Sequence, residues 1–311
     1  MQTFFKISLV LLFAFLFTNS LFSESKDPVR GKNGMVVSAS ELASKVGIEI
    51  LKKGGNAVDA AVAVGFALAV TYPAAGNIGG GGFMVIHLSD GTNTTIDYRE
   101  KAPMAATEFL FQDSLGNFLP EKSQIGVTSS GVPGSVAGLI YALEKYGTLT
   151  LAEVIQPAID LARNGFILEY RVARSLEYEN DSFNKFESSK KIFTKNGTAY
   201  SEGELFIQND LAYTLEQIKL NGIHGFYSGK IAELIVKQIN HQGGIITFDD
   251  LKNYHPIERP AITTDYKGYK VFTMGPPSGG GVSLLQMLNI LENCSFAKNE
   301  WGSSKYFHHL I

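Results

Sequence analysis

The sequence predicts a layered fold of helices and strands, and three observations support this prediction. Residues 57–72 are rich in Ala and Val and apolar on nearly every side, which is typical of a helix buried between other elements. Two short segments, residues 83–88 and 94–98, flank the turn Ser89-Asp90-Gly91 and are predicted to be paired strands. Several later segments have helical apolar spacing. This combination indicates an α+β protein whose helices and strands share a core.

The first predicted elements have defined ends. Residues 35–38 are a candidate strand, and a helix is predicted over residues 41–53, where Gly54 and the following glycine end it. Asn56 is suited to cap the helix over residues 57–72 through its side-chain oxygen. Asp59, the one charge of that helix, lies in the first turn, where the helix dipole favours a carboxylate.

The rest of the chain is predicted to be mostly helical. Helical apolar spacing is found in five segments: residues 135–146, 151–163, 210–220, 230–240 and 282–291. Residues 170–204 are rich in Glu, Asn, Ser and Lys, which predicts a solvated, peripheral segment. Residues 269–274 are a strand candidate. Residues 304–311 begin an amphipathic pattern without an end signal, so we expect the sequence to stop within an element.

The first residues are predicted to be an export signal. Lys6 precedes an apolar run from Ile7 to Phe17, which is shorter than the about 20 residues that span a bilayer. We therefore expect residues 1–23 to be a signal peptide and residues 24–311 to form one partial domain in a periplasmic or extracellular protein. No later segment has the length and apolar character of a membrane anchor.

Composition and motifs narrow the classes of function. The net charge is −3 and no basic stripe is present, which argues against a nucleic-acid partner. Cys294 is the only cysteine, so an intrachain disulfide is excluded. Adjacent His308 and His309 point in different directions on a helix and make a poor pair of metal ligands. We find no pattern that predicts a metal or a cofactor.

A glycine-rich segment, residues 76–82, has two open interpretations. It lacks the lysine of a phosphate-binding loop and the spacing of a dinucleotide-binding loop. It is either a tight backbone passage in which no Cβ fits or a backbone that lines a ligand cavity.

Arg99 is the one candidate binding residue. It lies at the end of a predicted strand in the segment Asp97-Tyr98-Arg99-Glu100-Lys101-Ala102-Pro103. A guanidinium offers a rigid fork of donors that suits a carboxylate, and Asp97 or Glu100 could orient it. The alternative is that Arg99 makes an internal salt bridge.

Taken together, ordered motifs from about residue 30 to the end resemble those of the γ-glutamyltransferase family, the glutathione hydrolase proenzymes. The matching segments, with intervening residues left out, are Gly54-Gly55-Asn56-Ala57-Val58-Asp59-Ala60-Ala61-Val62-Ala63, Gly76-Asn77-Ile78-Gly79-Gly80-Gly81-Gly82-Phe83, Asp97 to Pro103, Gly131-Val132-Pro133-Gly134-Ser135, Gly225-Phe226-Tyr227-Ser228-Gly229, Gly243-Gly244, Asp250-Leu251 and Gly275-Pro276-Pro277-Ser278-Gly279-Gly280.

The resemblance implies an N-terminal-nucleophile hydrolase fold, an αββα sandwich that is incomplete in this chain. It implies γ-glutamyl transfer from glutathione and related compounds to amino acids, peptides or water, through an acyl-enzyme on an N-terminal threonine. It implies that Arg99 binds the α-carboxylate of the γ-glutamyl group and that the glycine run packs behind that pocket. The partner would be a small subunit cut from the same proenzyme.

The nucleophile of the family is not found in this sequence. The family carries it in a T-T-H-x-S motif, whereas Thr94-Thr95 precedes Ile96 and Thr263-Thr264 precedes Asp265. We therefore name no catalytic residue and expect this chain to be inactive by itself. Two other functions stay open: a β-lactam acylase that takes a glutaryl-type side chain, and an exported binding protein without catalysis.

Overall fold

The computed structural model describes residues 28–294 and 301–311. Val36–Ile311 form one compact unit, and the described residues before them, 28–35, belong to a separate unit. The expected signal peptide, residues 1–23, lies outside the described residues. Residues 35–38, the first candidate strand, belong to no helix or strand, so that prediction is wrong.

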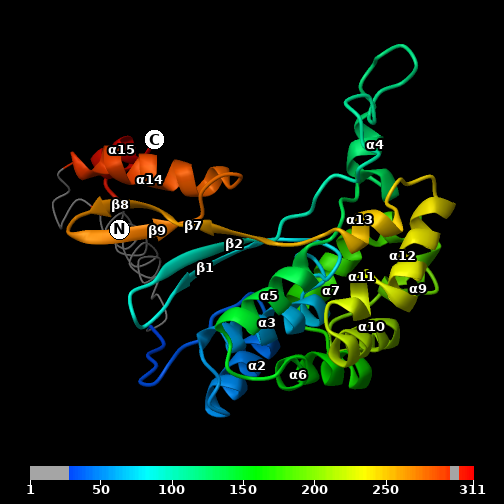
Figure 1. The fold of residues 1–311 in the computed structure, drawn as a ribbon, viewed down its shortest axis with the longest axis horizontal. Coiled ribbons are helices and arrows are strands. Elements are labelled where there is room, and N and C mark those ends of the chain that lie inside the picture. Colours follow the sequence, from blue (N-terminus) through cyan, green and yellow to red (C-terminus); the bar gives the residue numbers. More distant parts are fainter. Residues whose placement is uncertain (1–27, 295–300) are drawn as a thin grey trace, which may run out of the picture. The chain divides into compact units, whose positions relative to one another are not determined.

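A bundle of four helices forms the centre of the core (Figure 1). These helices are α2 (Glu41–Lys52), α3 (Ala57–Thr71), α5 (Ser135–Tyr146) and α6 (Leu151–Asn164). α3 packs against the other three, and most of its apolar residues are buried, with Ala57 and Ala61 exposed. Gly54 has φ +92°, a left-handed conformation that suits glycine at the end of α2.

An antiparallel sheet of three strands lies against these helices, with the order β1 (Phe83–His87), β2 (Asn93–Asp97) and β7 (Ile257–Pro260). Phe83 pairs with Asp97, and Asp97 pairs with Ile257. α5 packs against β2. Side chains alternate between the two faces of a strand, so buried Ile86 and Ile96 face the helices. Val85 and Ile257, on the opposite face, are 46% and 36% exposed.

Helices also cover the far side of α6. Helix α10 (Asn209–Asn221) packs against α6, and α12 (Gly229–His241) follows through α11 (His224–Tyr227). Between α6 and α10 the chain forms short elements: β3 (Phe166–Ile167), α7 (Tyr170–Tyr178), α8 (Asn180–Phe183), α9 (Glu187–Phe193), β4 (Thr194–Lys195), β5 (Thr198–Ala199) and β6 (Leu205–Phe206). Residues 170–204 therefore form short helices and strands. Ala173 and Leu176 are buried, while most polar side chains of the segment are at least partly exposed.

The C-terminal part contains a hairpin that is covered by a helix. β8 (Ile262–Tyr266) pairs with β9 (Tyr269–Thr273), and α14 (Gly279–Glu292) packs against both. β9 and α14 confirm the sequence prediction, while β7 and β8 were not predicted. The outer face of α14 exposes Leu284, Met287 and Ile290. Cys294 is half-buried. The remaining elements are α4 (Pro120–Gln124), the 3₁₀ turn η1 (Val127–Ser129), α13 (Phe248–Lys252) and α15 (Ser304–Leu310).

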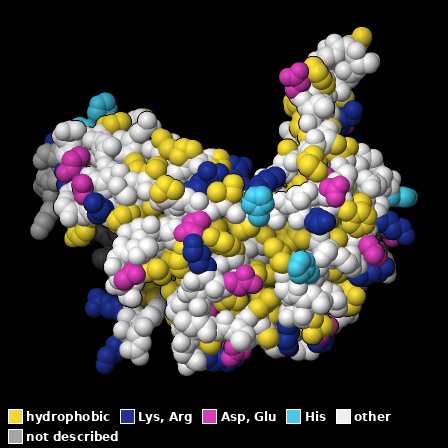
Figure 2. All heavy atoms as spheres, viewed as in Figure 1, with side chains coloured by type: hydrophobic (Ala, Val, Ile, Leu, Met, Phe, Trp, Pro, Cys, Tyr) yellow, Lys and Arg dark blue, Asp and Glu magenta, His cyan; other side chains and the backbone are white. Residues whose placement is uncertain are grey.

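This arrangement confirms an α+β fold in which a helical layer covers one face of an antiparallel sheet. Among the described helices, none has both the length and the apolar character to cross a bilayer. On the face drawn in Figure 2, Lys and Arg side chains are interspersed with Asp and Glu side chains.

Asp59 ties the start of α3 to the loop that follows α5. Its carboxylate accepts hydrogen bonds from the backbone of Asn56 and from the backbone and hydroxyl of Thr148, at 2.7–2.9 Å, and from the backbone of Leu149 at 3.1 Å. Burial by itself would raise the pKa of Asp59, but these donors lower it below its usual value. The carboxylate thus does more than interact favourably with the helix dipole. It also joins two elements of the core.

We predict that Asp59→Ala lowers stability by about 1–3 kcal/mol, because donors at a largely buried site lose their acceptor. The matched control is Asp113→Ala, since Asp113 also accepts several hydrogen bonds but lies in an exposed turn. The thermal midpoint of the full-length protein should fall clearly for the first variant and little for the second. Equal losses would contradict the role assigned to Asp59.

Candidate functional site

Arg99 lies two residues after the end of β2 and is exposed. Its guanidinium carbon is 5.8 Å from the centre of the Phe83 ring. Its backbone N–H donates to Oδ1 of Asp97 at 3.2 Å, and its carbonyl oxygen accepts a hydrogen bond from the Tyr254 hydroxyl at 2.8 Å. The backbone of Arg99 is therefore held on both sides, while its side chain stays accessible.

The internal salt bridge that the sequence left open for Arg99 is not found in the part of the chain that the structure describes. Asp97 pairs instead with Arg259 of β7, whose Nε and terminal nitrogen both lie 3.0 Å from Oδ2 of Asp97. Glu100, the other neighbouring acid, is exposed. The guanidinium of Arg99 thus has no ion-pair partner among these residues and can accept a carboxylate from elsewhere.

The residues after Arg99 are held by the same distant part of the chain, residues 250–260. Nζ of Lys101 donates to the carbonyl oxygen of His255 at 3.0 Å. The backbone N–H of Met104 donates to Oδ1 of Asp250 at 2.7 Å. The 250–260 segment therefore contacts residues 97–104 at four places: Asp97, Arg99, Lys101 and Met104.

Tyr254 is well suited to hold the Arg99 carbonyl. Burial raises the pKa of its hydroxyl above the usual value, and the nearby charges of Asp97 and Glu100 raise it further. The hydroxyl therefore stays protonated and remains a donor. Its ring stacks on Tyr227 at 5.7 Å, which fixes its position in the core.

The glycine-rich segment packs behind Arg99. A Cβ on Gly81 would lie 2.5 Å from the carbonyl oxygen of Tyr98 and 2.7 Å from the backbone nitrogen of Glu100. Gly82 and Tyr98 exchange two backbone hydrogen bonds, at 3.0 and 3.2 Å. The tight backbone passage predicted from the sequence is confirmed at Gly81.

The other interpretation, a backbone that lines a cavity, applies to the first residues of the glycine-rich segment. Residues 76–79 line a cavity of about 450 Å³ together with residues 191–193 and 207–211. A Cβ on Gly79 would meet open space. Arg99 does not line this cavity, so the cavity is separate from the Arg99 site.

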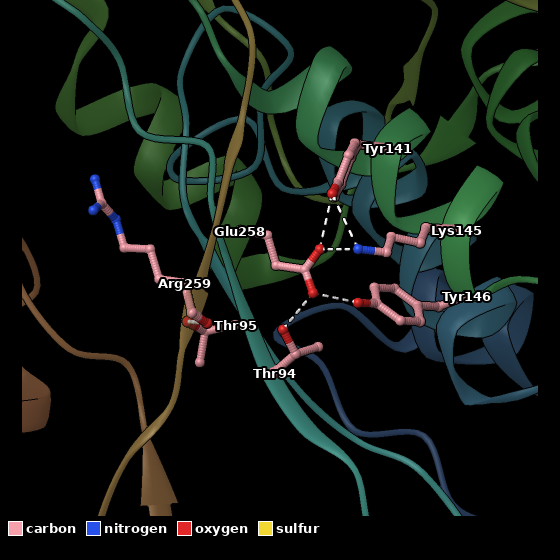
Figure 3. Close-up of polar contacts among 7 residues, drawn as sticks. All are labelled: Thr94, Thr95, Tyr141, Lys145, Tyr146, Glu258 and Arg259. Carbon is pink, nitrogen blue, oxygen red and sulfur yellow. Dashed lines mark hydrogen bonds and ion pairs between the residues drawn. The ribbon is translucent and has the colours of Figure 1, made fainter.

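On the helix-facing side of the sheet, the carboxylate of Glu258 in β7 accepts hydrogen bonds from four side chains (Figure 3). Thr94 of β2 and Tyr141 of α5 donate at 2.7 and 2.8 Å, and Tyr146 and Lys145 complete the cluster. Burial alone would raise the pKa of Glu258, but the ammonium of Lys145 and the three hydroxyls lower it to about 2. Arg259 points to the opposite face of the sheet, as alternation requires.

The sequence singles out Arg99 as a candidate but not the residues that hold it. Tyr254, Glu258 and Arg259 carry no local motif, and β7 was not predicted. Asp250 was noted only as part of a resemblance, and the contact of Asp250 with Met104 gives it a structural role. No signal within one sequence links Asp97 to a partner 162 residues away.

The fold defines the class of the protein first. The structure resembles crystallised N-terminal-nucleophile hydrolases: it matches gamma-glutamyltranspeptidase from Helicobacter pylori with a TM-score of 0.89 and 50% identity, over 91% of this chain and 81% of that one. The particular family follows from the sequence, since residues 43–311 match the family described as Gamma-glutamyltranspeptidase. The chain belongs to the gamma-glutamyltranspeptidase family.

Curated relatives agree with this assignment. The glutathione hydrolase proenzyme of Escherichia coli (strain K12) is 50% identical over 278 residues, which are 89% of this chain and 48% of that protein. The Acylase ACY 1 proenzyme of Pseudomonas sp. (strain V22) is more distant, at 36% identity over 92% of this chain and 52% of that protein. The chain spans about half the length of the curated relatives it matches.

We predict that Glu258 makes the stability of the folded protein depend on pH in the acidic range. The pKa of a glutamate in an unfolded chain is about 4.3, against about 2 in the folded protein. Because the folded-state pKa is depressed, the charged carboxylate stabilises the fold above about pH 4.3, and this contribution is lost as the pH falls toward about 2.

Thermal midpoints of the full-length protein and of its Glu258→Gln variant, measured from neutral pH down to about pH 2, test this prediction. The wild type should be the more stable protein at neutral pH, and the difference should shrink on acidification. A difference that stays constant over the whole range would contradict it.

Proposed function

We propose that this chain is the large-subunit portion of an exported γ-glutamyltransferase proenzyme. The complete enzyme would transfer the γ-glutamyl group of glutathione and related compounds to amino acids, peptides or water. One observation carries the proposal: within a chain of this family, Arg99 has a fixed backbone and an exposed guanidinium without an internal ion pair among the described residues. Such a group suits a substrate carboxylate.

The proposed role of Arg99 is to bind the α-carboxylate of the γ-glutamyl group. The guanidinium presents two parallel N–H donors that match the two oxygens of a carboxylate, which fixes orientation as well as charge. Binding at this end of the substrate would place the γ-amide at a fixed distance from Arg99, where the reacting groups of the second subunit would meet it.

The bond-breaking chemistry would lie in the partner subunit of the same proenzyme. An N-terminal threonine hydroxyl would attack the γ-amide carbon, and its proton would pass through its own free amine to the leaving amine. The resulting ester would then be attacked by an amino acid, a peptide or water, which releases the threonine. Reading the coding sequence for a T-T-H-x-S motif beyond residue 311 tests this part directly.

The acylase alternative uses the same arginine. A glutaryl group carries a carboxylate at a similar distance from the scissile amide but lacks the α-amino group, so Arg99 suits both substrates. The greater identity to glutathione hydrolase proenzymes favours γ-glutamyl transfer. Parallel assays with γ-glutamyl and glutaryl anilides discriminate between the two, and a protein that binds but cleaves neither would support a non-catalytic binding protein.

We predict that Arg99→Ala in the full-length enzyme weakens transition-state binding of γ-glutamyl substrates by about 2–5 kcal/mol. This is the usual cost of removing one member of a buried, hydrogen-bonded charge pair, and it applies here because the bound substrate and the second subunit would cover the guanidinium. Arg99→Lys should recover only part of the loss, since an ammonium cannot form the bidentate pair. The measurement is kcat/KM for release of the amine from a γ-glutamyl anilide.

The matched control for this variant is Arg174→Ala. Arg174 is also exposed and lies over an aromatic ring, with 5.9 Å between its guanidinium carbon and the Tyr170 ring centre. It lies in α7, and kcat/KM should be unchanged. An Arg99→Ala enzyme that keeps the wild-type kcat/KM would contradict the proposal that Arg99 binds the substrate carboxylate.

We also predict that export removes residues 1 to about 23, because a short apolar run follows Lys6. Expression of the full-length gene in a bacterium, followed by N-terminal sequencing of the extracytoplasmic fraction, measures this. Mature protein that still begins at Met1, or protein confined to the cytoplasm, would show the prediction to be wrong.

A further inference from the structure

A carboxylate of the same chain, that of Asp97, could compete with a substrate carboxylate for the guanidinium of Arg99. Asp97 lies two residues earlier, and residues i and i+2 of an extended chain share one face. Its side chain is only 9% exposed, so a charge there is poorly solvated and would attract a cation strongly. A free Asp97 carboxylate would therefore draw the Arg99 guanidinium back onto the sheet.

In the structure, Arg259 already binds this carboxylate. Its Nε and terminal nitrogen both contact Oδ2 of Asp97 at 3.0 Å, while Oδ1 accepts the backbone N–H of Arg99. Both oxygens of the carboxylate are thus occupied, and neither contacts the Arg99 side chain. Glu100 is a weaker competitor, because it is exposed to water and its side chain starts on the other side of the chain.

We propose that Arg259 is a positioning residue that neutralises Asp97 and thereby keeps the guanidinium of Arg99 free for the substrate carboxylate. This inference rests on the proposed role of Arg99 and extends it to a residue that would not touch the substrate. It explains why a strand-end carboxylate next to a binding arginine makes its ion pair with the adjacent strand.

The test compares two donors in the full-length enzyme: a γ-glutamyl anilide and the same anilide with its α-carboxylate converted to a carboxamide. The ratio of their kcat/KM values is the carboxylate preference. Arg259→Met should lower this preference about 10- to 100-fold, the factor expected from losing charge-assisted hydrogen bonds to the substrate. The loss should lie mainly in KM for the acid donor, with the amide donor little changed.

The decisive variant is the double substitution Asp97→Asn with Arg259→Met. The side-chain amide that replaces the Asp97 carboxylate would still accept the Arg99 N–H but carries no charge, so the carboxylate preference should return to near the wild-type value. Asp97→Asn alone should keep the preference as well, and this variant covers the case in which Arg259→Met does not fold. Arg259→Lys should give an intermediate value, since it keeps the charge without the fork.

The matched control is Arg163→Met, which removes an arginine from an ion pair with Glu216 between α6 and α10 and should leave the preference unchanged. The inference is overturned if Asp97→Asn loses the carboxylate preference. It is also overturned if Arg259→Met lowers kcat/KM equally for both donors and the double variant does not regain the lost kcat/KM. Failure of the underlying function is separate: it appears as an Arg99→Ala enzyme whose preference equals that of the wild type.

Discussion

The candidate site depends on contacts between residues 97–104 and the 250–260 segment. Residues 98–104 leave the sheet after β2 and lie outside its helices and strands, so local backbone hydrogen bonds alone do not fix their course. Arg259 pairs with Asp97, and the Tyr254 hydroxyl donates to the Arg99 carbonyl. Lys101 donates to the carbonyl oxygen of His255, and Asp250 accepts the backbone N–H of Met104. These partners are 146 to 162 residues away in the sequence. The geometry around Arg99 is therefore a product of the complete fold and cannot form early from local structure.

Strand β7 supplies this geometry through two adjacent charged residues. Glu258 faces α5 and joins the sheet to the helical layer, while Arg259 faces the other side and pairs with Asp97. A shift of β7 by one residue would exchange their faces, leaving a carboxylate beside Asp97 and a guanidinium beside Lys145. Both changes bring like charges together, so the two residues jointly fix the register of β7 against β2.

Local patterns were enough to predict the longer helices of this chain, and they were not enough for its short helices or for β7. The apolar surface of α3 and the cap at Asn56 are properties of neighbouring residues, and the structure confirms both. β7 has four residues, two of them charged and one proline, and becomes a strand only because β2 is available to pair with it. Residues 35–38 show the reverse case, since β-branched residues there have no partner strand in the described structure. Arg99 could be proposed as a candidate from the sequence because its position at a strand end is local, whereas the identity of its supporting residues is not.

The packing around Tyr98 explains how an exposed arginine can have a fixed backbone. The Tyr98 ring lies against Gly138 of α5 and against Gly82, where a Cβ would approach the ring to 2.1 and 2.9 Å. Its carbonyl oxygen would be met at 2.0 Å by a Cβ on Gly134. Tyr98 is thus enclosed by three glycines immediately before Arg99, and Tyr254 holds the chain immediately after Tyr98 through the Arg99 carbonyl. With the backbone ordered on both sides, a ligand that binds the guanidinium has to order only the side chain, which lowers the entropic cost of binding. Gly82 of the glycine-rich segment, together with Gly134 and Gly138, would therefore contribute indirectly to the proposed binding, because these glycines let the chain approach Tyr98 closely enough to hold it.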